Sequence, residues 1–117
     1  MKSKIQSVLA NNARRLRLLA RKSQMEVAKI AGVSQKTICN LEAPDAVVSP
    51  KLATIEALAR GFHLHPAVLL LEGITDEALT DRQLGLMIEK FVQLPDHRKR
   101  QIMDLIADFA RLEDRQP

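Results

Sequence analysis

The sequence predicts an all-α fold, with a five-helix domain over residues 1–73 and a two-helix hairpin over residues 74–117. Apolar residues recur at steps of three and four along most of the chain, which is the helical period. The strict alternation and the Asn-Gly or Asp-Gly turns of β-hairpins are missing from the sequence. Helix-capping residues divide the chain at several points, and a length of 117 residues suits one domain with a small appendage.

The first helix is expected from Ser3 to Arg21, because apolar residues follow a helical spacing there. These apolar positions are Ile5, Val8, Leu9, Leu16, Leu19 and Ala20. Ser23 and Glu26 then form a capping-box pattern, in which the hydroxyl and the carboxylate each accept a hydrogen bond from the other residue's backbone amide. The pattern predicts that a second helix begins at Gln24.

A short turn joins the second helix to a third. Gly32 is expected to end the second helix at Ala31 in a left-handed conformation, and Ser34 to cap a third helix over residues 35–42. Pro44 prevents that helix from continuing much further. So short a connection forces a sharp crossing, as in a helix-turn-helix. The seam between the two helices is expected to contain Val27, Ala28, Ala31, Val33, Ile38 and Leu41.

Two more helices complete the predicted first domain. Ser49 is expected to cap the fourth helix, with Pro50 as its first residue, and this helix ends near Gly61. A short fifth helix is expected over residues 66–71, and it stops at Gly73.

The second block begins with Thr80 and Gln83, a further capping-box pattern that predicts a helix over residues 81–94. A last helix is expected over residues 95–112 and, because almost no loop precedes it, should fold back antiparallel. The pair is too small to bury a core alone. Homodimerisation is therefore expected through its apolar residues, with packing inside one subunit as the alternative. These residues are Leu84, Met87, Phe91, Ile102, Ile106 and Phe109.

Charge is distributed unevenly along the chain. Residues 1–42 carry nine basic and two acidic side chains, a net charge of +7, whereas residues 74–117 carry seven basic and nine acidic ones, a net charge of −2. This asymmetry predicts that the first part meets a polyanion, although solvated surface lysines and arginines are the alternative. Aromatic residues make up 3% of the chain, without Trp or Tyr, which disfavours single-stranded nucleic acids bound by base stacking.

The single cysteine, Cys39, excludes an internal disulfide and zinc sites built on cysteine pairs. With no apolar run at the N-terminus and none long enough to cross a bilayer, the expected location is cytoplasmic, with no membrane contact. Cys39 itself is expected to be partly buried. His63, His65 and His97 are expected to be surface side chains, so no metal site is predicted.

Several segments resemble the phage repressor and Cro family of XRE-type helix-turn-helix regulators. They are residues 12–17, 23–28, 31–34, 37–38, 41–42 and 50–59. The resemblance covers residues 5–71 and implies binding of double-stranded DNA, with the third helix in the major groove. Two features depart from the family. Glu42 is followed by Ala43 and Pro44 rather than by a nearby glycine, and Arg21 and Lys22 replace a glycine and a hydrophobic residue.

Four polar side chains of the third helix are expected to contact base edges, the alternative being ordinary exposed side chains. They are Gln35, Lys36, Thr37 and Asn40. Contacts to DNA phosphates are expected from Arg14, Arg17, Arg21, Lys22 and Gln24. Two-fold symmetry of a dimer would match a palindromic operator.

The function expected from this resemblance is that of a sequence-specific transcriptional regulator, a repressor of phage or mobile-element type. An antitoxin-type regulator whose C-terminal helices bind a partner protein is the alternative. The self-cleaving peptidase domain of larger relatives does not fit into residues 74–117, so no enzymatic activity is expected. The sequence indicates no cofactor and no small-molecule ligand.

Overall fold

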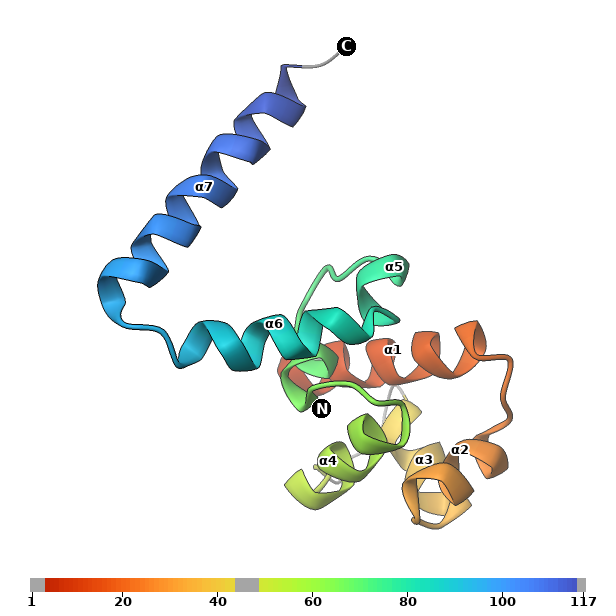
Figure 1. The fold of residues 1–117 in the computed structure, drawn as a ribbon. Helices are drawn as coiled ribbons and strands as arrows, with labels where there is room; N and C mark the ends of the chain where they lie inside the picture. Colours follow the sequence, from red (N-terminus) through yellow and green to blue (C-terminus); the bar gives the residue numbers. More distant parts are fainter. Residues whose placement is uncertain (1–3, 44–48, 116–117) are drawn as a thin grey trace. The chain divides into compact units, whose positions relative to one another are not determined.

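The computed structural model describes residues 4–43 and 49–115. Within these ranges the only regular elements are helices (Figure 1), which confirms the predicted all-α class. In chain order they are α1 (Lys4–Leu19), α2 (Gln24–Ala31), α3 (Gln35–Glu42), α4 (Leu52–Gly61), the 3₁₀ helix η1 (Pro66–Leu70), α5 (Asp76–Leu79), α6 (Arg82–Val92) and α7 (Asp96–Asp114). None of the helices in this part of the chain combines the length and the hydropathy needed to cross a bilayer.

The chain divides into two compact units, Met1–Gly85 and Leu86–Pro117. The first unit therefore extends beyond Gly73, the boundary predicted from the sequence. The reason is packing: Leu79 of α5 is completely buried. Gly85 is also buried, so close to His65 that an added Cβ would lie 3.1 Å from the His65 backbone nitrogen.

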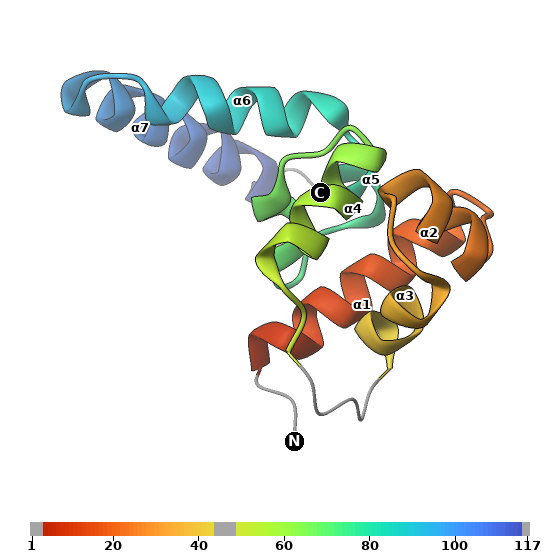
Figure 2. The ribbon, with the colours of Figure 1, turned by 90° about the horizontal axis from the view of Figure 1, so that it is seen from below.

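The core of the first unit is aliphatic. In Figures 1 and 2, α2 and α3 pack against each other beside α1 and α4, and η1 packs against both α1 and α4. The apolar side chains buried most completely in this core are Leu9, Val27, Ile38, Leu58, Val68, Leu69 and Leu79. Ile38 and Leu41 face inward as predicted, and this fixes which face of α3 is left for solvent.

One polar side chain, Asn12, is buried in this core. Its amide donates hydrogen bonds of 3.0 Å to the carbonyl oxygens of Leu69 and Leu71, at the end of η1. Arg15, one turn later on α1, donates to Asp76 Oδ1 at 2.6 Å and to the Ile74 carbonyl at 2.8 Å. Both side chains therefore connect α1 to segments of the same unit that come later in the sequence.

The fourth helix starts later than predicted. Lys51 takes the N-cap position without a side-chain hydrogen bond, and Pro50 precedes the helix rather than opening it. Ser49 does not cap, because its hydroxyl accepts a hydrogen bond from the Gln6 amide of α1. The predicted end at Gly61 is confirmed.

Thr80, predicted to cap the helix that follows it, does not do so. Its hydroxyl donates back to the carbonyl oxygens of Asp76 and Glu77, closing α5, a helix the sequence did not predict. Asp81 replaces it at the start of α6, where its carboxylate accepts from the Gln83 amide at 2.9 Å. The predicted capping box of Thr80 and Gln83 is therefore wrong, because α5 already uses that hydroxyl.

The second unit consists of the later part of α6 and of α7. The chain reverses direction at the turn between them, and the two helices splay apart from it (Figure 1). Met87 and Phe91 of α6 and Ile102 and Ile106 of α7 line one groove, and close antiparallel packing of the two helices stays a prediction. Pro95 has extended backbone angles, which redirect the chain between the two helices. Leu84, predicted for the dimer surface, lies in the first unit and is half-buried.

Candidate nucleic-acid interface

The helix-turn-helix begins with a complete capping box. The Ser23 hydroxyl accepts from the Glu26 amide at 3.1 Å, and the Glu26 carboxylate accepts from the Ser23 amide at 3.0 Å. The hydrogen bond from the Ser23 backbone lowers the pKa of Glu26. The box therefore contributes stability at neutral pH that is lost as the pH falls through this lowered pKa.

Gly32 forms the turn between α2 and α3. Its φ of 71° lies in the left-handed region, and the Val33 amide donates to the Ala28 carbonyl at 3.0 Å. This is the hydrogen-bond pattern of a Schellman C-cap. Ser34 then caps α3 by accepting from the Thr37 amide at 3.1 Å. All three predicted features of the turn region, the glycine and the two serine caps, are confirmed.

Replacing Gly32 with valine is expected to lower the free energy of unfolding by about 1–2 kcal/mol, because an L side chain is strained at this φ. An added Cβ would have no atom within 4 Å, so the cost comes from the backbone and not from crowding. Gly32→Asn is the matched control, since asparagine tolerates left-handed angles better. Denaturant unfolding measures both. Equal stabilities for the valine variant and the unaltered protein would contradict the strain.

The outer face of α3 carries the predicted base-contacting residues. Gln35, Lys36 and Asn40 are exposed, and in the described part of the chain none of their side chains has a hydrogen bond or an ion pair. Thr37 is half-buried, and its hydroxyl lies 2.8 Å from the Ser34 hydroxyl. Three predicted side chains are therefore available to a ligand, and the fourth is held near the start of the helix.

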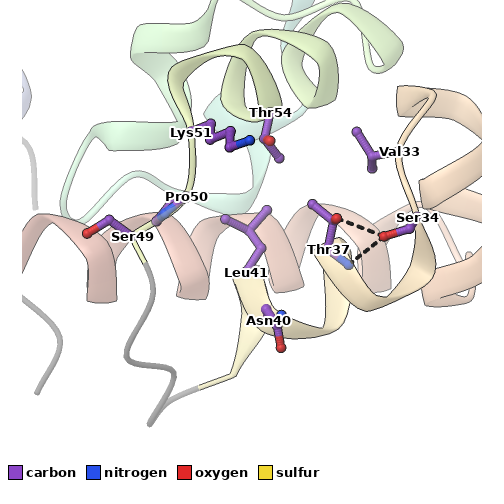
Figure 3. A pocket seen from close by; sticks show the side chains of 9 residues that line it. All are labelled: Val33, Ser34, Thr37, Asn40, Leu41, Ser49, Pro50, Lys51 and Thr54. Atoms are coloured by element: carbon purple, nitrogen blue, oxygen red, sulfur yellow. Dashed lines mark hydrogen bonds between the residues drawn. The ribbon is translucent and has the colours of Figure 1, made fainter.

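A groove of about 400 Å³ lies between α3 and the start of α4 (Figure 3). It is lined by Val33, Ser34, Thr37, Asn40, Leu41, Ser49, Pro50, Lys51 and Thr54. Lys51, the N-cap residue of α4, and Thr54 in its first turn lie across the groove from Thr37 and Asn40. Lys51 was not predicted as a site residue, because the Ser49-Pro50 pattern placed the start of the fourth helix two residues too early.

Arg17, predicted to contact phosphate, forms an ion pair with Glu42. Its guanidinium donates to both carboxylate oxygens, with Nε 2.8 Å from Oε2 and Nη2 2.9 Å from Oε1. The Arg17 side chain is 14% exposed and that of Glu42 only 5%. The hydrogen bond to Glu42 raises the pKa of Arg17. This pair connects the end of α1 to the end of α3, so Arg17 positions α3 and is not a free cation.

The other predicted phosphate-contacting residues surround this pair. Arg14, Gln24 and Cys39 line one shallow depression beside it, and the Gln24 amide lies 3.4 Å from Glu42 Oε1. Arg14 is exposed, and so is Cys39, which was expected to be partly buried; α3 turns its buried face elsewhere.

Arg21 and Lys22 follow the end of α1. Arg21 is exposed and has a φ of 56°, the left-handed conformation that usually favours glycine. The Lys22 amide donates to the Arg17 carbonyl at 3.1 Å, and Lys22 is half-buried. Arg21 therefore adds an exposed charge at the turn that ends α1.

The three histidines differ in exposure and in hydrogen bonding. His63 and His97 are exposed, whereas His65 is half-buried and its Nδ1 accepts from the Ala67 amide at 3.1 Å, capping η1. Residues 4–43 and 49–115 hold no group of three or more potential ligands that could bind a metal ion.

Comparisons with family models, with curated proteins and with solved structures found no match. What this surface binds is therefore inferred from its own geometry and charge.

Proposed function

We propose that this protein is a sequence-specific regulator of transcription that binds double-stranded DNA, with α3 as its reading helix. The observation that carries the proposal is the combination of a capped helix-turn-helix with an exposed polar face on its second helix. Ile38 and Leu41 are anchored in the core, while Gln35, Lys36 and Asn40 face solvent. A helix held this way can enter the major groove without rearranging.

The side chains of this face suit base edges. Gln35 and Asn40 can each make paired hydrogen bonds to adenine, and Lys36 can donate to guanine. The Thr37 hydroxyl is held by Ser34, which leaves its methyl group for contact with a thymine methyl. Three kinds of contact from four side chains of one helix support recognition of a sequence rather than only of the phosphate backbone.

Basic residues around α3 supply the sequence-independent attraction. Arg14 and Arg21 are exposed, and Lys51 lies at the start of α4 beside the groove. Gln24, at the N-terminus of α2, adds an amide where a helix end already favours an anion. Each contact releases counterions, so binding should weaken steeply as the salt concentration rises. Occupying an operator in this way would block transcription, and a repressor role is the one we propose.

Replacing Gln35 with alanine is expected to cost about 1–3 kcal/mol of binding on a preferred site and to leave binding to random DNA almost unchanged. Arg14→Ala should instead weaken binding to both and reduce the salt slope by about one. Preferred sites are first selected from random duplexes, and the affinities of each variant are then measured by fluorescence anisotropy at several salt concentrations.

Arg60→Ala is the charge-matched control for Arg14→Ala. Arg60 is exposed in the last turn of α4, at the opposite end of that helix from the groove. Loss of the Arg60 charge should leave the affinities for selected and for random duplexes almost unchanged, apart from a small long-range electrostatic effect. Gln35→Ala and Arg14→Ala variants that behave alike on selected and random duplexes would contradict the assignment of α3 as the reading helix.

A further inference from the structure

A groove lies between α6 and α7 inside the second unit. Its volume is about 420 Å³, and seven apolar side chains and one charged side chain line it. Met87 and Phe91 lie on the α6 side, and Ile102, Met103 and Ile106 on the α7 side. Sites for small molecules have volumes of about 300–1,000 Å³ and are mostly apolar with a few polar groups. The groove therefore has the size and the lining of such a site.

Two lysine side chains border this groove. The charged lining residue is Lys90, and none of the lining residues is acidic. Lys99 of α7 adds a second ammonium group, because its Nζ lies 6.0 Å from the centre of the Phe91 ring, which lines the groove. Within residues 4–43 and 49–115 neither lysine forms an ion pair with a carboxylate. An apolar surface is thus bordered by two cations that lack a carboxylate partner.

The charges of the whole second unit favour an anion at this groove. Residues 86–103, which include every lining residue except Ile106, carry four basic and two acidic side chains, a net charge of +2 with His97 neutral. Residues 104–117 carry two basic and four acidic ones, a net charge of −2. The first set is Lys90, Arg98, Lys99, Arg100, Glu89 and Asp96, and the second is Arg111, Arg115, Asp104, Asp108, Glu113 and Asp114. An anionic head group is therefore attracted toward residues 86–103 and repelled by the rest of α7.

We propose that the groove binds a medium-chain fatty acid as its carboxylate. The alkyl chain lies along the apolar side chains, and the carboxylate pairs with Lys90 and Lys99. A neutral apolar ligand would desolvate the lysines without a counter charge, and a cationic amphiphile would be repelled by them. Met87 and Met103 suit a flexible chain, because their unbranched thioether side chains adapt to its shape.

Binding of this ligand requires neither DNA nor a second copy of the chain, because every lining residue belongs to one unit of one chain. Dimerisation through the same helices stays a prediction. A volume near the lower end of the range for small-molecule sites favours a medium-chain over a long-chain acid. Decanoate is therefore the probe.

Isothermal titration calorimetry of the full chain with decanoate, below its micelle-forming concentration, should show a single site per chain with a Kd of about 0.1 mM. Hexanoate should bind at least about tenfold more weakly, because it buries fewer methylene groups. Decanediol, with a neutral head group on the same chain, should bind about fivefold more weakly, and decyltrimethylammonium should not bind. At about 1 M salt, where charges are screened, decanoate should lose its advantage over decanediol.

Lys90→Gln and Lys99→Gln should each raise the Kd for decanoate about threefold and leave that for decanediol unchanged. Met103→Glu places a carboxylate beside the bound chain and should raise the Kd for decanoate at least about tenfold. Arg100→Gln is the control for the lysines, since it removes a cation of the same basic run that does not line the groove. Leu112→Glu is the control for Met103→Glu, because Leu112 is similarly exposed and lies outside the groove. Neither control should change the Kd appreciably.

Failure of decanoate to saturate a site would overturn the proposal, and a chain that then sediments as a dimer would show that a second copy covers the groove. Several bound decanoate molecules per chain, unaffected by Met103→Glu, would overturn it in favour of general adsorption to exposed apolar side chains. Equal affinities for decanoate and decanediol would show that the lysines select no anion, which also contradicts it. None of these results bears on the affinity of the first unit for DNA.

Discussion

Replacing Glu42 with alanine is expected to lower the free energy of unfolding by about 3 kcal/mol. The change leaves the Arg17 guanidinium almost buried without its carboxylate, and it removes two close hydrogen bonds that connect α1 to α3. Losing one partner of a buried ion pair costs more than the pair contributes, because the remaining charge stays desolvated. Chemical denaturation at neutral pH measures the effect.

Glu56→Ala is the matched control, since Glu56 forms an ion pair with Arg60 while both side chains are mostly exposed. Its loss should cost less than about 1 kcal/mol. Arg17→Met should also destabilise, and the double variant Arg17→Met, Glu42→Leu should recover most of the stability, because two apolar side chains bury no charge. If Glu42→Ala costs no more than Glu56→Ala, the pair does not support the orientation of α3.

The helix-turn-helix could be predicted from the sequence because its signals are local. Ser23 and Glu26 specify one helix start, Ser34 another, and Gly32 the turn between them, each within a few residues. Neighbouring backbone amides are the partners in every case, so no knowledge of the tertiary fold is needed.

Side-chain partners far apart in the sequence could not be predicted in this way. Arg17 has the same sequence character as Arg14, yet one faces Glu42 and the other faces solvent. Ser49 is a good N-cap residue by local rules, but α1 supplies Gln6 as a competing partner for its hydroxyl. In both cases a long-range contact decides what a locally ambiguous residue does.

Gly61 shows the same limit. The sequence predicts it as the end of α4, which is confirmed, but its second role depends on tertiary packing. An added Cβ there would lie 2.5 Å from Ile30 Cγ2 and 3.2 Å from the Ile30 carbonyl oxygen. The glycine therefore also permits the close approach of α2 and α4, which helical spacing does not reveal.

Ending the chain after Gly73 is expected to destabilise the first unit by about 3–5 kcal/mol, whereas ending it after Leu94 should leave that unit folded. The shorter chain lacks α5 and with it Leu79, which is completely buried, and Asp76, which binds Arg15. Removing α5 leaves a cavity in the aliphatic core, and it leaves the Arg15 guanidinium without its carboxylate partner. The longer chain keeps both contacts and the close packing of Gly85 on His65.

Thermal unfolding followed by circular dichroism compares the two truncated chains with the full chain. Leu79→Ala in the full chain separates the effect of the core from that of chain length, and it should cost about 3 kcal/mol. Leu52→Ala is the control, since Leu52 is 83% exposed and its loss should cost less than about 0.5 kcal/mol. If the chain ending at Gly73 unfolds at the same temperature as the chain ending at Leu94, the first unit ends at Gly73 and α5 does not contribute to its stability.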